Sequence, residues 1–117
     1  MANDVILVVD YEPMRREKTS ELLVQNDYAA EGTDTADSAH TLLWADGTRY
    51  SLLLITTNLP GSLGAQDLAG EVRERKPDFP VVFIDDAETS PQLPGAPVLR
   101  KNFTLGQLLN AVETALR

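Results

Sequence analysis

Three short runs of apolar residues, uninterrupted by polar ones, most constrain what this chain can fold into. They cover residues 5–9, 52–55 and 81–84 and consist of Val, Ile, Leu and Phe. A strand with one face in water alternates apolar and polar residues, whereas a strand buried on both faces does not. The runs therefore predict a sheet that is covered on both sides. A shorter run at 98–99 and a weaker candidate at 28–31 complete a set of five strands.

Apolar residues recur at helical spacing between these predicted strands. Within residues 36–43, 65–72 and 105–116, the residues at positions i, i+3, i+4 and i+7 are apolar or His, which predicts three helices. Residues 13–26 are expected to form another helix, because they begin with a proline that suits a first helical turn. Before the last of these stripes, Thr104 and Gln107 form a capping box. Alternating strands and helices predict an α/β fold with a parallel sheet.

Residues 86–96 interrupt this alternation. The segment around them holds Pro91, Pro94 and Pro97 at three-residue steps, together with Gly95. Proline in a helix interior costs about 3 kcal/mol. We therefore expect at most one helical turn near 87–90, followed by an extended loop.

Composition excludes several classes of function. The chain has 117 residues and is expected to form a single domain, 1–117. Its 10 Lys+Arg and 18 Asp+Glu give a net charge of −8, which disfavours binding to nucleic acid or to anionic membranes. The absence of cysteine excludes disulfides, thiolate zinc sites and cysteine nucleophiles. No apolar run approaches the ~20 residues of a membrane span, and no basic signal-peptide region precedes residue 5, so we expect a cytoplasmic protein.

Polar residues follow each predicted strand. In an open parallel sheet, ligands bind beyond the carboxyl ends of the strands. The sequence therefore predicts a functional crevice at this edge. The residues that follow the strands are Asp10, Tyr11 and Glu12; Thr56, Thr57 and Asn58; Asp85 and Asp86; and Arg100 and Lys101.

Several of these segments, in this order, resemble one known family. The segments are residues 5–10 followed by Glu12 and Pro13, residues 59–61 with Gly64, residues 80–84, and residues 99–103. The chain resembles the receiver domain of bacterial two-component response regulators over essentially its full length. This resemblance implies a doubly wound, flavodoxin-like, five-stranded parallel sheet with strand order 2-1-3-4-5. Only 16 positions separate Asp85 from Lys101, fewer than is usual in the family, so the fourth helix is expected to be shortened or missing.

The resemblance also implies a phosphoryl-transfer pocket with several substitutions. Receivers accept a phosphoryl group from a histidine kinase on an aspartate that ends the third strand, beside a divalent cation and a lysine. Asp10 matches the family's first acid and Lys101 its lysine. Tyr11 stands where the second acid is expected, Thr56 at the phosphoacceptor position, and Asp85 at the position of a hydroxyl residue.

These substitutions lead to the hypothesis of a pseudo-receiver. Threonine is a far poorer acceptor than a carboxylate, and Asp10 is left as the single acid at the usual metal position, so Mg²⁺ binding is weakened. Asp85 is expected to pair with Lys101, which at ~4 Å and an effective dielectric near 20 gains about 4 kcal/mol before desolvation. Val98 replaces the aromatic switch residue of the family.

On this hypothesis the module needs no phosphorylation, has no catalytic residue and is not an enzyme. It acts through contact with a histidine kinase, a phosphotransfer protein or another signalling protein, without nucleic acid or membrane. We expect no effector domain after the last predicted helix, and we therefore expect the output to pass through such a partner. No cofactor is required.

Two alternatives stay open. The first is a true receiver phosphorylated at a displaced aspartate, Asp85 or Asp10. The second is a sensor of a small ligand or divalent metal that uses the crevice of Asp10, Asp85 and Lys101.

Two further features have ordinary structural explanations. His40, the single histidine, lies on the inner stripe of its predicted helix and is expected to pack there. Arg15, Arg16 and Lys18 form a basic group on the first predicted helix, a helix that docks the kinase in receivers. A solvated helix face explains this group equally well.

Overall fold

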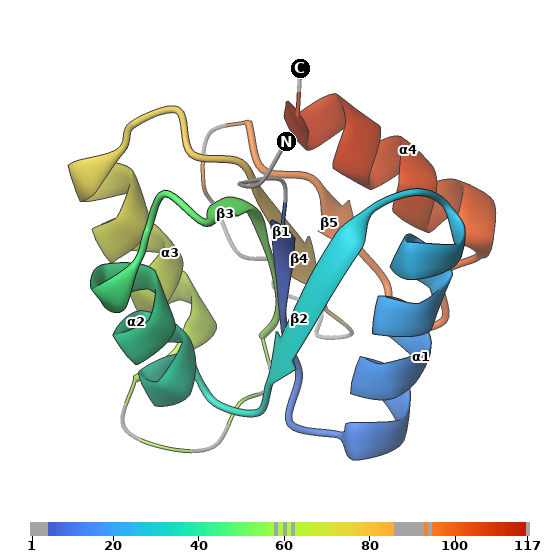
Figure 1. Cartoon of the computed structure of the whole chain (residues 1–117), viewed down its shortest axis with the longest axis horizontal. Helices are drawn as coiled ribbons and strands as arrows, with labels where there is room; N and C mark the ends of the chain where they lie inside the picture. Colours follow the sequence, from blue (N-terminus) through green and yellow to red (C-terminus); the bar gives the residue numbers. More distant parts are fainter. Residues whose placement is uncertain are drawn as a thin grey trace.

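Five parallel strands form the centre of the molecule (Figure 1). The computed structural model describes residues 5–57, 59, 61, 63–85, 93 and 95–116. The strands are β1 (Val5–Val9), β2 (Ala29–Thr33), β3 (Tyr50–Thr56), β4 (Val81–Ile84) and β5 (Val98–Leu99), and the helices are α1 (Pro13–Gln25), α2 (Ala36–Ala45), α3 (Ala65–Arg75) and α4 (Leu105–Leu116). The strand order is β2-β1-β3-β4-β5, so the predicted doubly wound sheet is confirmed.

The element bounds agree closely with the sequence pattern. The strands expected at 5–9, 81–84 and 98–99 have those bounds, β3 is longer than expected, and β2 lies slightly further along the chain. The segment in which a shortened fourth helix was expected includes 86–92 and 94, which lie outside the described residues. That expectation therefore stays a prediction.

The two faces of the sheet have separate cores, which explains the uninterrupted apolar runs. Successive strand side chains point to opposite faces. Leu7, Leu53 and Phe83 pack with residues of α2 and α3 in one cluster. Ile6 and Leu54 pack with residues of α1 and α4 in the other. Figure 1 shows the same division, with one pair of helices on each side of the sheet.

Side-chain caps fix where the helices begin. Glu12 caps α1, because its carboxylate accepts hydrogen bonds from the amides of Met14 and Arg15 at 3.3 and 2.8 Å. The predicted capping box at α4 is confirmed: the Thr104 amide donates to Gln107 Oε1 at 2.9 Å, and the Gln107 amide donates to Thr104 Oγ1 at 3.2 Å. The cap at Glu12 places the first turn of α1 directly after the end of β1.

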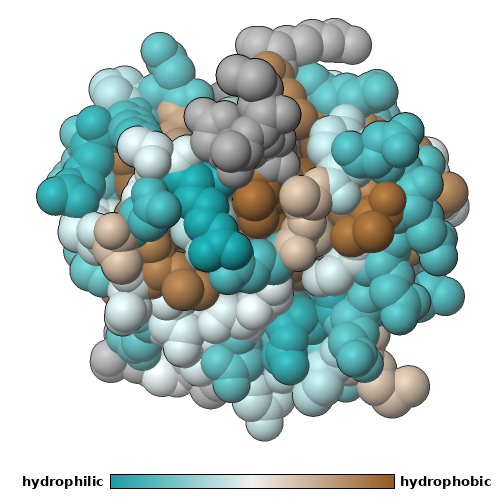
Figure 2. Space-filling model, viewed as in Figure 1, coloured by the Kyte–Doolittle hydropathy of each residue, from teal (hydrophilic) through white to brown (hydrophobic). Residues whose placement is uncertain are grey.

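The visible surface is mostly hydrophilic (Figure 2), with hydrophobic residues in small separate patches. This agrees with a composition in which charged residues make up 24% of the chain. Within the described residues, no helix has both the length and the apolar character needed to cross a bilayer.

Candidate functional site

The strand register brings the predicted site residues to one edge of the sheet. Val9 pairs with Ile55 and Thr56 pairs with Ile84, so Asp10 follows β1 beside Thr56 and Asp85 follows β4 beside Thr57. Asp10 and Asp85 are each 1% exposed, and Thr56 is fully buried. Buried polar groups of this kind need partners, since an unpaired buried charge is costly.

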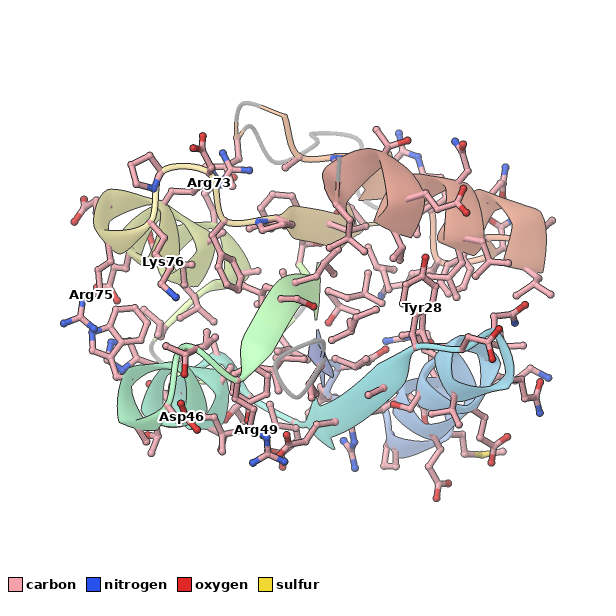
Figure 3. The ribbon with its side chains drawn as sticks, turned by 45° about the horizontal axis from the view of Figure 1, so that its top comes forward. Tyr28, Asp46, Arg49, Arg73, Arg75 and Lys76 are labelled. Carbon is pink, nitrogen blue, oxygen red and sulfur yellow. The ribbon has the colours of Figure 1, made fainter. Side chains whose placement is uncertain are left out.

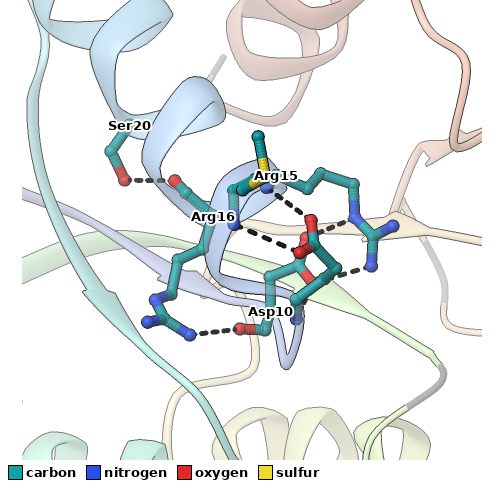
Figure 4. A network of polar contacts seen from close by, with 6 residues as sticks. Asp10, Arg15, Arg16 and Ser20 are labelled. Carbon is teal, nitrogen blue, oxygen red and sulfur yellow. Dashed lines mark hydrogen bonds and ion pairs between the residues drawn. The ribbon is translucent and has the colours of Figure 1, made fainter.

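Asp10 is held by an arginine that the sequence analysis did not place in the site. Arg15 Nε lies 2.6 Å from Asp10 Oδ2, and Arg15 Nη2 donates to Oδ1 at 2.8 Å. Both carboxylate oxygens therefore bind one guanidinium group, as Figure 4 shows. The Glu12 amide adds a third hydrogen bond to Oδ1 at 3.0 Å. Such a two-pronged contact is among the strongest ion-pair geometries in proteins.

The next residue of α1 supports the same turn. Arg16 Nη1 donates to the backbone oxygen of Asp10 at 2.9 Å, and the Ser20 hydroxyl donates to the backbone oxygen of Arg16 at 2.9 Å (Figure 4). Of the basic group on α1, Arg15 and Arg16 thus contact the end of β1, whereas Lys18 is exposed.

Asp85 has a different set of contacts. The Thr57 hydroxyl donates to Asp85 Oδ1 at 2.5 Å, and Arg100 Nη1 lies 3.8 Å from Oδ2. Arg100 is the neighbour of Lys101, which is half-buried. The expected contact of Asp85 with Lys101 stays a prediction.

The tip of the central strand carries a hydroxyl. Within the described part of the chain, Thr56 Oγ1 is buried and has no hydrogen-bond partner. Leaving such a group unsatisfied costs about 1–3 kcal/mol. Tyr11, at the position where the resemblance expects an acid, is 58% exposed and directs much of its surface to solvent.

These residues do not fit a magnesium ion. Mg²⁺ is bound through one or two carboxylates in near-octahedral geometry. Both oxygens of Asp10 already accept hydrogen bonds from Arg15, and the described residues contain no group of three His, Asp or Glu side chains arranged to hold a metal. The positive charge beside Asp10 is therefore supplied by the guanidinium group of Arg15.

The fold corresponds to a known class, the receiver domains of two-component response regulators. The sequence itself matches no model of a protein family and no curated protein. Its structural neighbours at high TM-score are receiver domains. The chain therefore has the receiver fold.

Two of these structures illustrate the likeness. A response regulator receiver protein from Sinorhizobium medicae is 23% identical, with a TM-score of 0.88 over 96% of this chain and 93% of that one. The receiver domain of NtrX from Brucella abortus is 28% identical, with a TM-score of 0.84 over 95% of this chain and 97% of that one.

Proposed function

We propose that this chain is a receiver-like signalling module that works without phosphorylation, through contact with protein partners. The observation that carries the proposal is the guanidinium group of Arg15 on both oxygens of Asp10. In receivers, the acid at this position helps to hold a divalent cation. Here an internal cation satisfies it, so the pocket is neutralised without metal or phosphate.

The end of β3 supports the same proposal. Phosphoryl transfer needs a nucleophile, and a hydroxyl group becomes one only when a base activates it. Thr56 stands at the phosphoacceptor position, and no base bonds to its hydroxyl among the described residues. The two nearby acids interact instead with Arg15 and with Thr57 and Arg100.

The proposal implies a module that has no turnover of its own and acts in the cytoplasm. Its partners are a histidine kinase, a phosphotransfer protein or another signalling protein. The likeness to solved receiver domains supports this class of partner, because receivers act on other proteins.

Incubation with acetyl phosphate tests the proposal. The protein and an ordinary receiver domain are treated in the same tube with Mg²⁺, and intact mass reports phosphorylation. We expect label on the ordinary receiver and none on this chain. Stoichiometric, base-labile label on this chain would overturn the proposal, and its loss in Asp85→Asn or Asp10→Asn would identify a displaced acceptor.

Manganese titration tests the sensor alternative. Mn²⁺ quenches the fluorescence of aromatic side chains close to it. Binding is therefore followed through the fluorescence of Tyr11, which lies beside Asp10 in the sequence. We expect no saturable quenching in the wild type, because Arg15 covers both oxygens of Asp10. Saturable quenching that Asp10→Asn abolishes would support a metal sensor and contradict the proposed function.

A further inference from the structure

A cavity of about 300 Å³ lies at the opposite edge of the sheet from the acid pocket. It opens between the C-terminal ends of α2 and α3, and its lining includes Leu43, Trp44, Val72, Arg75, Lys76 and Phe79. β3 begins at this edge with Tyr50 and ends at the acid pocket with Thr56. At ~3.3 Å per residue, roughly 20 Å of strand separates the two sites.

The walls of the cavity are apolar and fixed in place. Leu43, Val72 and Phe79 are buried. Trp44 stacks on His40, with ring centroids 4.0 Å apart and an angle of 12° between the ring planes. His40 Nε2 in turn lies 3.3 Å from Glu71 Oε2, which links α2 to α3. The tryptophan ring is therefore held in position before any ligand arrives.

Two cations line the same cavity. The guanidinium carbon of Arg75 lies 4.8 Å from the centroid of the Trp44 ring, and Lys76 Nζ lies 5.9 Å from that of Phe79. Figure 3 shows Arg75 and Lys76 on the side of α3 that faces α2. Both side chains are exposed.

Among the described residues, the lining contains no carboxylate, although the whole chain carries a net charge of −8. The helix ends contribute partial negative charge here. Lys76 lies close to this partial negative charge, and its Nζ donates a hydrogen bond to the backbone oxygen of Gly47 at 3.3 Å. Two of the nearby acids have partners: Glu71 lies beside His40, and Asp46 accepts a hydrogen bond from the Thr48 hydroxyl. Arg75 and Lys76 are the charged side chains among the described residues of the lining.

We propose that this cavity binds a small aromatic carboxylate. Its ring would pack against Trp44 and Phe79, and its acid group would bind Arg75 and Lys76. The volume is at the lower end of the range of about 300–1,000 Å³ for small-molecule sites, which suits a ligand of one ring. The site lies outside the acid pocket, so the proposal goes beyond the proposed function and does not depend on it.

Phenylacetate is the probe, and Trp44, the single tryptophan, is the reporter. The indole N–H resonance of Trp44 is followed by NMR during titration of the whole chain. Benzylamine has a similar ring with the opposite charge, and acetate has the acid group without the ring. We expect a saturable shift with phenylacetate only. Equal binding of benzylamine, or no saturable shift with phenylacetate, would overturn the proposal.

Exposed variants test the role of the two cations without disturbing the core. The double variant Arg75→Gln with Lys76→Gln should weaken phenylacetate binding at least ten-fold, whereas Lys18→Gln on α1 should leave it unchanged. Undiminished affinity in the double variant would contradict the assignment of the anion site. A shift that appears only with an acidic, Phe-containing peptide would assign the cavity to a protein partner and refute the small-ligand proposal.

Discussion

Replacing Arg15 with glutamine tests the arrangement on which the proposed function rests. The change removes two charge-assisted hydrogen bonds, at 2.6 and 2.8 Å, from a carboxylate that is 1% exposed. Hydrogen bonds to charged groups contribute about 1.5–3 kcal/mol each. The Arg15 side chain is 26% exposed, so water reaches part of the gap. We expect a loss of about 2–4 kcal/mol in the free energy of unfolding.

This loss is large enough to measure by heat or by urea. For a chain of 117 residues the unfolding entropy is about 0.25 kcal/mol/K. A loss of about 3 kcal/mol therefore lowers Tm by about 12 °C. Circular dichroism during urea unfolding gives the same quantity without extrapolation in temperature.

Two controls separate the ion pair from the change of charge. Lys18→Gln removes the same charge from an exposed position of the same helix and should alter stability by less than about 0.5 kcal/mol. Adding Asp10→Asn to Arg15→Gln should recover part of the loss, with a coupling energy of at least about 1 kcal/mol. If Arg15→Gln behaves like Lys18→Gln, or if no coupling is found, Arg15 does not hold Asp10 in solution.

Three other changes have defined outcomes. Burial, followed by the hydrogen bond and the charge of Glu31, raises the pKa of Tyr50 above its ordinary value of 10.0. The neutral Tyr50 side chain therefore contributes fully to stability below about pH 10, and this contribution is lost as pH rises further. In Tyr50→Phe, the free energy of unfolding measured in urea should fall less steeply above pH 10 than in the wild type. An equally steep fall in the two proteins would refute this. Asp27, which lies two residues beyond the end of α1, has φ 72°, so Asp27→Gly should raise the free energy of unfolding measured in urea by about 0.5–1 kcal/mol, and an unchanged or lower value would contradict this. Thr104→Ala should lose about 1 kcal/mol in urea unfolding by breaking the capping box, and an unchanged midpoint would contradict it.

The strands were predictable because burial on both faces leaves a simple mark in the sequence. β1 and β4 have only apolar residues, and their bounds follow directly. β2, at the edge of the sheet, is partly exposed and contains Glu31 and Gly32, so its pattern is weak. β3 begins two residues earlier than expected, because Ser51 interrupts the apolar run although Tyr50 is buried.

The candidate site was only partly predictable. Residues that follow parallel strands meet at one edge, so Asp10, Thr56 and Asp85 could be selected from position alone. Arg15 could not be selected in this way, because an arginine in the first turn of a helix usually faces water. The available signal was its spacing of five residues from Asp10 across a turn that Glu12 caps. The cavity at the other edge required tertiary structure, because α2, α3 and the loop before β4 each contribute to it.

The contacts of Asp10 bear on where a signal can enter the module. A switch needs two arrangements, and a ligand shifts them only through unequal affinity for the two. With both oxygens of Asp10 bonded to Arg15, a phosphoryl group or metal ion at this edge would first have to displace a buried ion pair. At the other edge, the positioned ring of Trp44 and the exposed cations Arg75 and Lys76 offer contacts that need no such displacement. Binding of the proposed ligand at the amino edge of the sheet therefore would not require the ion pair of Asp10 and Arg15 to break.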